Sequence, residues 1–277
     1  MVPLQALVRL TRLWNLLIIG LAQYCTAYFL ISPGNLSDPK LFLLTLSTMI
    51  IAAGGYSIND YYDVKLDLIN KPERVVVGKS LTRRRVLLIH SVLSTTGTVM
   101  GFFLSWPLGV LNFSVAFLLW LYSNALKRLP FIGNLTVALL TGLAVFAVNL
   151  LYLPVHIIVL VYVLYAFFMT LIREIIKDME DLKGDDTFGC RTLPIIWGLR
   201  NTKVFVYGLI ILFFGAVVAI HLLLTHMPVI FFTGFLLMPM GILVVWLIRA
   251  DTKKDYHYLS QFTKLIMLAG IFSMAFL

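Results

Sequence analysis

Long apolar runs, separated by short polar or proline-containing breaks, dominate the pattern of this 277-residue chain. Each run is close to the roughly 20 mostly apolar residues that a membrane-spanning helix needs. Proline favours the start of a helix over its interior, so Pro107, Pro154 and 225–228 indicate breaks between successive helices, although 106–107 could instead be a kink. The pattern predicts nine spanning helices, at 14–31, 41–58, 86–105, 108–126, 132–152, 154–176, 203–224, 227–249 and 260–277.

Composition supports the membrane as the solvent. The chain is 60% hydrophobic and 13% charged, whereas a soluble domain carries about 25% charged residues. We therefore expect an all-α integral membrane protein with a single transmembrane domain over 1–277. Arg9 and Arg12 precede the first run, but no clear small-residue cleavage site follows it, so a spanning helix is expected rather than a cleaved signal. Cys25 and Cys190 are not expected to form a disulfide or a zinc site.

Basic residues sort by loop. All 22 Lys and Arg residues except Lys40 fall at the N-terminus or around the even-numbered loops. The positive-inside rule then predicts that the N-terminus and these loops are cytosolic. The net charge of +9 is thereby explained by topology and by anionic headgroups of membrane lipids, and no nucleic-acid partner is expected.

Acidic residues are concentrated in two short segments on the same predicted side. Ten of the thirteen Asp and Glu residues lie within 60–73 or 174–186. The two segments could simply be solvated loops without a specific function, because a lone DxxxD is weak evidence of a site. Two such segments, each following a spanning helix, favour a functional site instead.

The first segment reads NDYYDVKLD at 59–67. If the helix continues to about residue 68, Asn59, Asp63 and Asp67 lie on one face, with Asp60 beside them. Like charges one turn apart repel each other, and a divalent cation removes that cost. Oxygen-only ligands suit Mg²⁺, which completes its coordination with water and substrate phosphate.

The second segment reads DMEDLKGD at 178–185, so Asp178, Asp181 and Asp185 share a helical face. Arg173 and Lys177 lie on an adjacent face, one turn apart. Carboxylates beside cations suit a metal–diphosphate complex, because metals join carboxylate to phosphate and the cations neutralise the remaining charge.

These residues closely resemble the motifs of the UbiA superfamily of intramembrane prenyltransferases. The segment 59–67 is similar to its NDxxDxxxD motif, NKPER at 70–74 to its NxPxR extension, and 178–185 to its DxxDxxxD motif. YSNALKR at 122–128 and RTLPIIWG at 191–198 resemble further family segments. The likeness is greatest to the digeranylgeranylglyceryl phosphate synthase branch, with departures at 75–78 and at Asp186.

The resemblance implies about nine helices around a central cavity and an enzyme that transfers a prenyl group from an allylic polyprenyl diphosphate. The implied acceptor is geranylgeranylglyceryl phosphate, with an aromatic quinone precursor as the alternative. The cofactor would be Mg²⁺, as two ions. Their ligands would be Asn59, Asp60, Asp63, Asp67, Asp178, Asp181 and Asp185.

Other roles follow from the same resemblance. Asp63, Asp67, Asp181 and Asp185, with Lys127 and Arg74, are the expected catalytic residues. The residues expected to bind diphosphate are Asn59, Arg74, Lys127, Arg128, Arg173 and Lys177.

Arg12, Asn15 and Tyr122 are candidates to bind the acceptor. Arg12 could equally be a positive-inside anchor, and tyrosine is common at membrane interfaces.

A cation-coupled transporter is the alternative outside enzymes, but its acids would be expected near the bilayer midplane. A CDP-alcohol phosphotransferase also uses acids and metal, but in one continuous motif.

Overall fold

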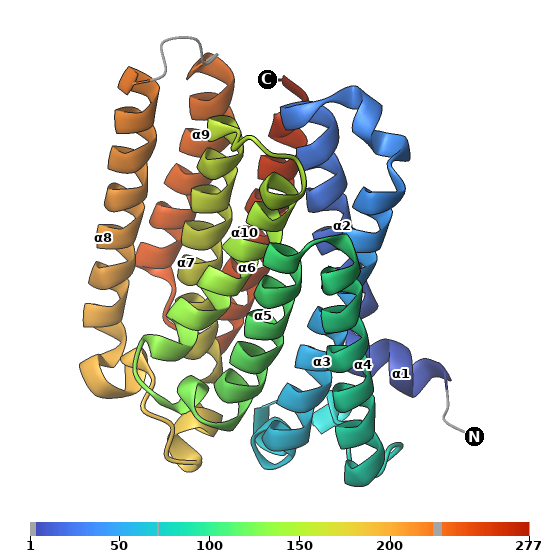
Figure 1. Cartoon of the computed structure of the whole chain (residues 1–277). Coiled ribbons are helices and arrows are strands. Elements are labelled where there is room, and N and C mark those ends of the chain that lie inside the picture. Colours follow the sequence, from blue (N-terminus) through green and yellow to red (C-terminus); the bar gives the residue numbers. More distant parts are fainter. Residues whose placement is uncertain (1–3, 71, 224–228, 277) are drawn as a thin grey trace.

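The computed structural model describes residues 4–70, 72–223 and 229–276, and the side chains within them except at 74 and 220–237. These residues form a bundle of long, nearly antiparallel helices (Figure 1). In chain order the helices are α1 Leu4–Thr11, α2 Leu13–Cys25, α3 Pro39–Asn70, α4 Arg83–Leu104, α5 Trp106–Asn124, α6 Ile132–Leu151, α7 Ile157–Thr187, α8 Leu193–Leu223, α9 Val229–Arg249 and α10 Lys253–Ser273, with short 3₁₀ or π turns at Thr26–Ile31, Pro33–Ser37, Pro72–Arg74, Leu126–Arg128 and Met274–Phe276.

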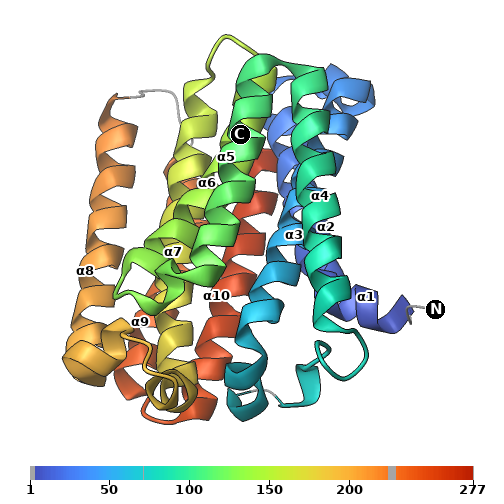
Figure 2. The ribbon, with the colours of Figure 1, turned by 60° about the horizontal axis from the view of Figure 1, so that its bottom comes forward.

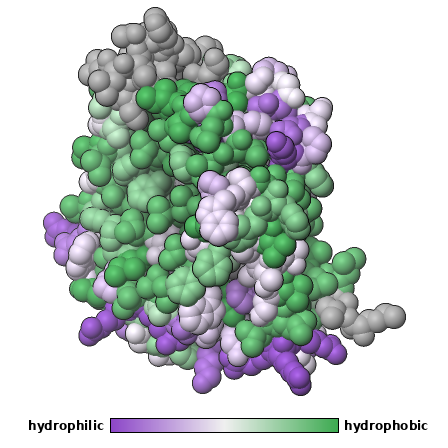
Figure 3. All heavy atoms as spheres, in the orientation of Figure 1, coloured by the Kyte–Doolittle hydropathy of each residue, from purple (hydrophilic) through white to green (hydrophobic). Residues whose placement is uncertain are grey.

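The all-helical membrane fold predicted from the apolar runs is confirmed. In the described part of the chain, eight helices are long and apolar enough to cross a membrane, and Met238–Arg249 is a shorter apolar helix. Figure 3 shows apolar side chains around the middle of the molecule, with hydrophilic ones along the bottom and in a smaller patch at the top. The predicted break at 225–228 lies outside the described residues.

The division at 106–107 is a true break. Ser105 has an extended backbone, and its hydroxyl accepts a hydrogen bond from the Leu108 amide at 3.4 Å, as an N-cap does. Pro107 stands in the first turn of α5, where a missing amide hydrogen has no consequence. The α4–α5 pair is therefore a helical hairpin.

Two helices extend well past their predicted apolar ends. α3 has 32 residues and α7 has 31, so each is about 47 Å long at 1.5 Å per residue. The hydrocarbon core is only about 30 Å thick. The acidic segments therefore continue these helices, as the spacing of their carboxylates predicted.

Helix α1 was not predicted from the apolar runs. It projects sideways from the bundle (Figures 1 and 2). Ala6 and Leu10 are buried against Val77 and Leu81, whereas Leu4 stays exposed. This amphipathic character is typical of a helix lying in the membrane interface.

Close packing of α7 against α10 forms part of the main core. Tyr165 of α7 donates a hydrogen bond to the Ile266 carbonyl at 2.5 Å. A Cβ on Gly270 would lie 2.1 Å from the Tyr165 ring, so only glycine fits there. The first half of α7 is thus held against α10.

Candidate active site

The two acidic segments meet where α3 and α7 end. Both ends lie at the bottom of Figure 2. Gly184, inside the second segment, packs so tightly on Asn70 that an added Cβ would lie 2.3 Å from its Oδ1 atom. Lys253, at the start of α10, reaches the Asn70 carbonyl at 3.5 Å. Segments more than 100 residues apart in the chain are therefore brought together.

Asn59 and Asp63 share a helical face, as their spacing predicted. The Asn59 amide donates a hydrogen bond to Asp63 Oδ2 at 2.8 Å. Lys127, in the turn after α5, forms an ion pair with Asp63 Oδ1. The side chains of Lys127 and Asp63 are only 11% and 13% exposed. Lys65 is exposed and takes no part.

Asp60 faces a different partner. Its Oδ1 accepts a hydrogen bond from Arg12 at 2.7 Å. The Arg12 guanidinium also lies over the Tyr56 ring, 4.9 Å from its centroid. Arg12 has a left-handed backbone with φ of 51°, uncommon for a residue with a side chain. Arg12 is the residue between α1 and α2. Its contact joins a predicted acceptor-binding residue, Arg12, to a predicted metal ligand, Asp60.

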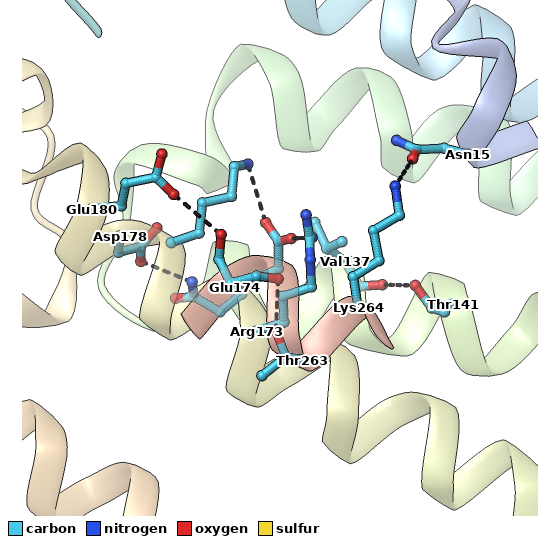
Figure 4. A network of polar contacts seen from close by, with 12 residues as sticks. Asn15, Val137, Thr141, Arg173, Glu174, Asp178, Glu180, Thr263 and Lys264 are labelled. Carbon is cyan, nitrogen blue, oxygen red and sulfur yellow. Dashed lines mark hydrogen bonds and ion pairs between the residues drawn. The ribbon is translucent and has the colours of Figure 1, made fainter. Parts of the chain in front are cut away.

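The second segment gains partners from neighbouring helices (Figure 4). Asp178 Oδ2 accepts a hydrogen bond from the Asn134 amide of α6 at 2.8 Å. Buried Glu174 pairs with Arg173 at 2.5 Å and with Lys177 at 3.5 Å. Two of the predicted diphosphate-binding cations, Arg173 and Lys177, are thus held by the carboxylate of Glu174.

The remaining predicted residues lie around the same centre. Asp67 is close enough to Lys177 to feel its charge. Tyr122 is close enough to feel the charges of Glu174 and Asp63. Asp185 is buried and Asp181 is partly buried. Arg128 is exposed, and its carbonyl accepts a hydrogen bond from the Arg191 amide at 3.0 Å. The Arg74 side chain and Lys71 lie outside the described residues.

The carboxylates suit Mg²⁺, although they do not form a closed cage. In the parts of the chain that the structure describes, no three His, Cys, Asp or Glu side chains are grouped closely enough to hold a metal ion. Mg²⁺ is usually bound through one or two carboxylates, with water and substrate phosphates completing its coordination. The oxygen-only donor set therefore fits a metal that binds together with a diphosphate.

Three polar residues near the acidic segments, Asn134, Glu180 and Lys264, were not predicted from the sequence to take part in the site. Asn134 gave no signal beyond a polar residue in an apolar run. Glu180 is buried and binds His257 at 3.0 Å and Ser260 at 3.2 Å, joining the second segment to α10. Lys264 was counted with the loop cations but lies well inside α10.

Cys190 follows the second segment. Burial raises the pKa of its thiol, and the Asp185 carboxylate adds to that effect. This raised pKa favours the protonated thiol, which is a weaker nucleophile than the thiolate.

A profile of the UbiA prenyltransferase family matches residues 20–266. The chain belongs to that family, and it is an integral-membrane prenyltransferase. Its relatives include the digeranylgeranylglyceryl phosphate synthase of Methanosphaera stadtmanae, 32% identical over 248 residues that cover 87% of this chain and 89% of the relative. The synthase of Saccharolobus solfataricus is 33% identical, covering 87% and 83%.

Solved structures share the fold. One comes from work on digeranylgeranylglyceryl phosphate synthase in membranes; it has a TM-score of 0.76 and 22% identity and covers 99% of this chain and 97% of its own. A UbiA homologue from Archaeoglobus fulgidus, bound to GPP and Mg²⁺, has a TM-score of 0.67 and 17% identity, covering 98% and 100%.

Proposed function

We propose that this protein transfers a geranylgeranyl group from its allylic diphosphate to geranylgeranylglyceryl phosphate, releasing diphosphate. The observation that supports this most is the meeting of the two acidic segments, each already contacted by cations, where α3 and α7 end. The names of the two relatives above support the choice of acceptor.

The carboxylates of Asp63, Asp67, Asp178, Asp181 and Asp185, with Asn59, would hold Mg²⁺, as two ions. When bound, the metal supplies positive charge that stabilises the departing diphosphate. Asp60 would contribute to the site by holding the Arg12 guanidinium in place.

Lys127 positions Asp63 and adds positive charge beside the diphosphate. Arg173 and Lys177, held by Glu174, do the same from α7, and Arg128 would approach from the turn after α5. Arg74 is a further candidate. Charge that is already in place where negative charge develops lowers the barrier to breaking the allylic C–O bond. Apolar helix faces exclude water from the resulting carbocation.

The active site would face the cytosol. The basic loops between α3 and α4 and between α7 and α8 lie at the same end as the acidic segments, and the positive-inside rule assigns that end to the cytosol. The donor would then enter with its diphosphate in water and its chain in the bilayer.

An assay of prenyl transfer tests the proposal. Purified protein in lipid vesicles is given radiolabelled geranylgeranyl diphosphate and geranylgeranylglyceryl phosphate, and the labelled product is measured. Product should form with Mg²⁺ and disappear with EDTA. Asp63→Ala and Asp181→Ala should each lower the rate by at least about 100-fold, because each removes a group that acts on the leaving diphosphate. The control is Asp186→Ala, since Asp186 is exposed beside the second segment.

A hydroxylated aromatic acid, offered as the acceptor in a parallel reaction, tests the alternative. Transfer to that acid alone would reject the lipid acceptor. Transfer to neither acceptor would reject the proposed function, and full activity in both alanine variants would reject the assigned site.

A further inference from the structure

Lys264 is a cation in the apolar part of a spanning helix. It lies eleven residues after the first residue of α10, between buried Thr263 and Ile266. At 1.5 Å per residue, its Cα is about 16 Å along the helix from that end. That distance places it where the bundle enters the apolar belt, and a lysine there is costly unless it faces a polar interior, so it marks a functional position by default.

Among the described residues, no carboxylate forms an ion pair with Lys264. Its ammonium donates a hydrogen bond to the side-chain oxygen of Asn15 in α2, at 2.8 Å. A neutral amide orients an ammonium but leaves its charge uncompensated.

A second cation acts on Lys264. Arg173 is close enough to repel Lys264 electrostatically, and its Nε atom is buried without a partner among the described residues. The carboxylate of Glu174 is shared between Arg173 and Lys177. In the part of the chain that the structure describes, Lys264 and Arg173, whose Nε donor is unused, therefore lie together where the only paired carboxylate, Glu174, is already shared with Lys177. The positive charge of this region exceeds its negative charge.

This region is beside the metal-binding carboxylates and not among them. In Figure 4, Arg173 and Glu174 lie between Asp178 on one side and Lys264 with Asn15 on the other. An anion at Lys264 would thus be adjacent to a diphosphate held by the acidic segments.

We propose that Lys264, together with Arg173 and Asn15, binds the phosphate monoester of the acceptor lipid and so selects phosphorylated acceptors. The proposal rests on the proposed function and adds a determinant of acceptor class. A phosphate monoester carries between one and two negative charges near pH 7 and accepts several charge-assisted hydrogen bonds. It would supply the charge that this region lacks.

Steady-state kinetics of Lys264→Met test the proposal. The KM for geranylgeranylglyceryl phosphate should rise by about tenfold or more, the expected scale for losing a charge-assisted hydrogen bond. The KM for the prenyl diphosphate should stay within twofold. Lys264→Arg should restore most of the affinity, and Lys254→Met, which removes an exposed lysine of the same helix, should behave as wild type.

The unphosphorylated acceptor geranylgeranylglycerol isolates the phosphate contact. Wild type and Lys264→Met should use it equally, because neither can gain from the missing group. An equal penalty with and without the phosphate would overturn the proposal, as would a matching rise in the donor KM. A penalty confined to an aromatic carboxylate acceptor would also overturn it.

Asn15→Asp provides an independent variant if Lys264→Met does not fold, as judged by gel filtration. A carboxylate at 15 would neutralise Lys264, so the KM for the phosphorylated acceptor should rise while the donor KM stays constant; an unchanged acceptor KM would contradict the proposal. Absence of transfer by wild type to any acceptor would instead reject the proposed function.

Discussion

Asn134 and Lys127 hold carboxylates that belong to other helices. Asn134 of α6 donates to Asp178, and Lys127 pairs with Asp63 of α3. Both acids would otherwise be poorly compensated at the edge of an apolar bundle, where an unsatisfied polar group costs about 1–3 kcal/mol. These partners fix the directions in which the remaining carboxylate oxygens point.

Asn134→Leu should raise the Mg²⁺ concentration for half-maximal rate by about 10- to 100-fold, the usual effect of removing a group that orients a metal ligand. Titration of prenyl transfer with Mg²⁺ measures this.

Asn149→Leu is the matched control on the same helix. Asn149 is fully buried and accepts a hydrogen bond from the His156 amide at 2.9 Å, away from the acidic segments. Its replacement should lower stability without changing the Mg²⁺ requirement. If both variants titrate as wild type does, Asn134 has no role in orienting Asp178.

At the scale of elements, the site depends on how closely the ends of α3 and α7 approach. Gly184 lacks the Cβ that would collide with Asn70. The absence of a side chain at 184 therefore lets the Asn70 side chain pack directly against the second acidic segment.

Gly184→Ala should lower kcat/KM by about tenfold or more and destabilise the fold by about 1–3 kcal/mol, because the added methyl group forces the two helix ends apart. Kinetics and thermal unfolding in vesicles measure both effects. Gly142→Ala is the control, since a Cβ there would meet Val163 at an ordinary 3.4 Å.

Replacing Asn70 with serine in the Gly184→Ala background should recover part of the activity, because the smaller side chain makes room for the methyl group. Additive losses in this double-mutant cycle would show that the two residues are not coupled.

The sequence predicted the elements better than the contacts between them. Helical spacing placed Asn59, Asp63 and Asp67 on one face because that spacing is local. The contacts of Asn134 and Lys264 could not be predicted, since they depend on which helices pack together. The eight-residue α1 is too short to stand out as an apolar run.

For the whole molecule, the acidic segments, the basic loops and α1 all lie toward one end of an apolar bundle (Figures 1 and 3). The α2–α3 connection lies at the other end, as does Lys40 in the first turn of α3. This asymmetry gives the protein one predicted orientation in the membrane.

Single cysteines at Lys79 and Lys40, both exposed, test that orientation in a background with Cys25 and Cys190 replaced by alanine. A membrane-impermeant maleimide should label Lys79→Cys only from the cytosolic side and Lys40→Cys only from the opposite side. The reverse pattern would place the active site outside the cytosol.

The extension of α3 and α7 past the apolar belt has a kinetic consequence for the proposed reaction. Diphosphate would depart into water, whereas both the acceptor and the prenylated product stay in the bilayer. Turnover would then follow the mole fraction of acceptor in the membrane, not its bulk concentration. Diluting the bilayer with inert lipid at constant total acceptor should slow the enzyme, and the separation of the two products between phases would oppose the reverse reaction.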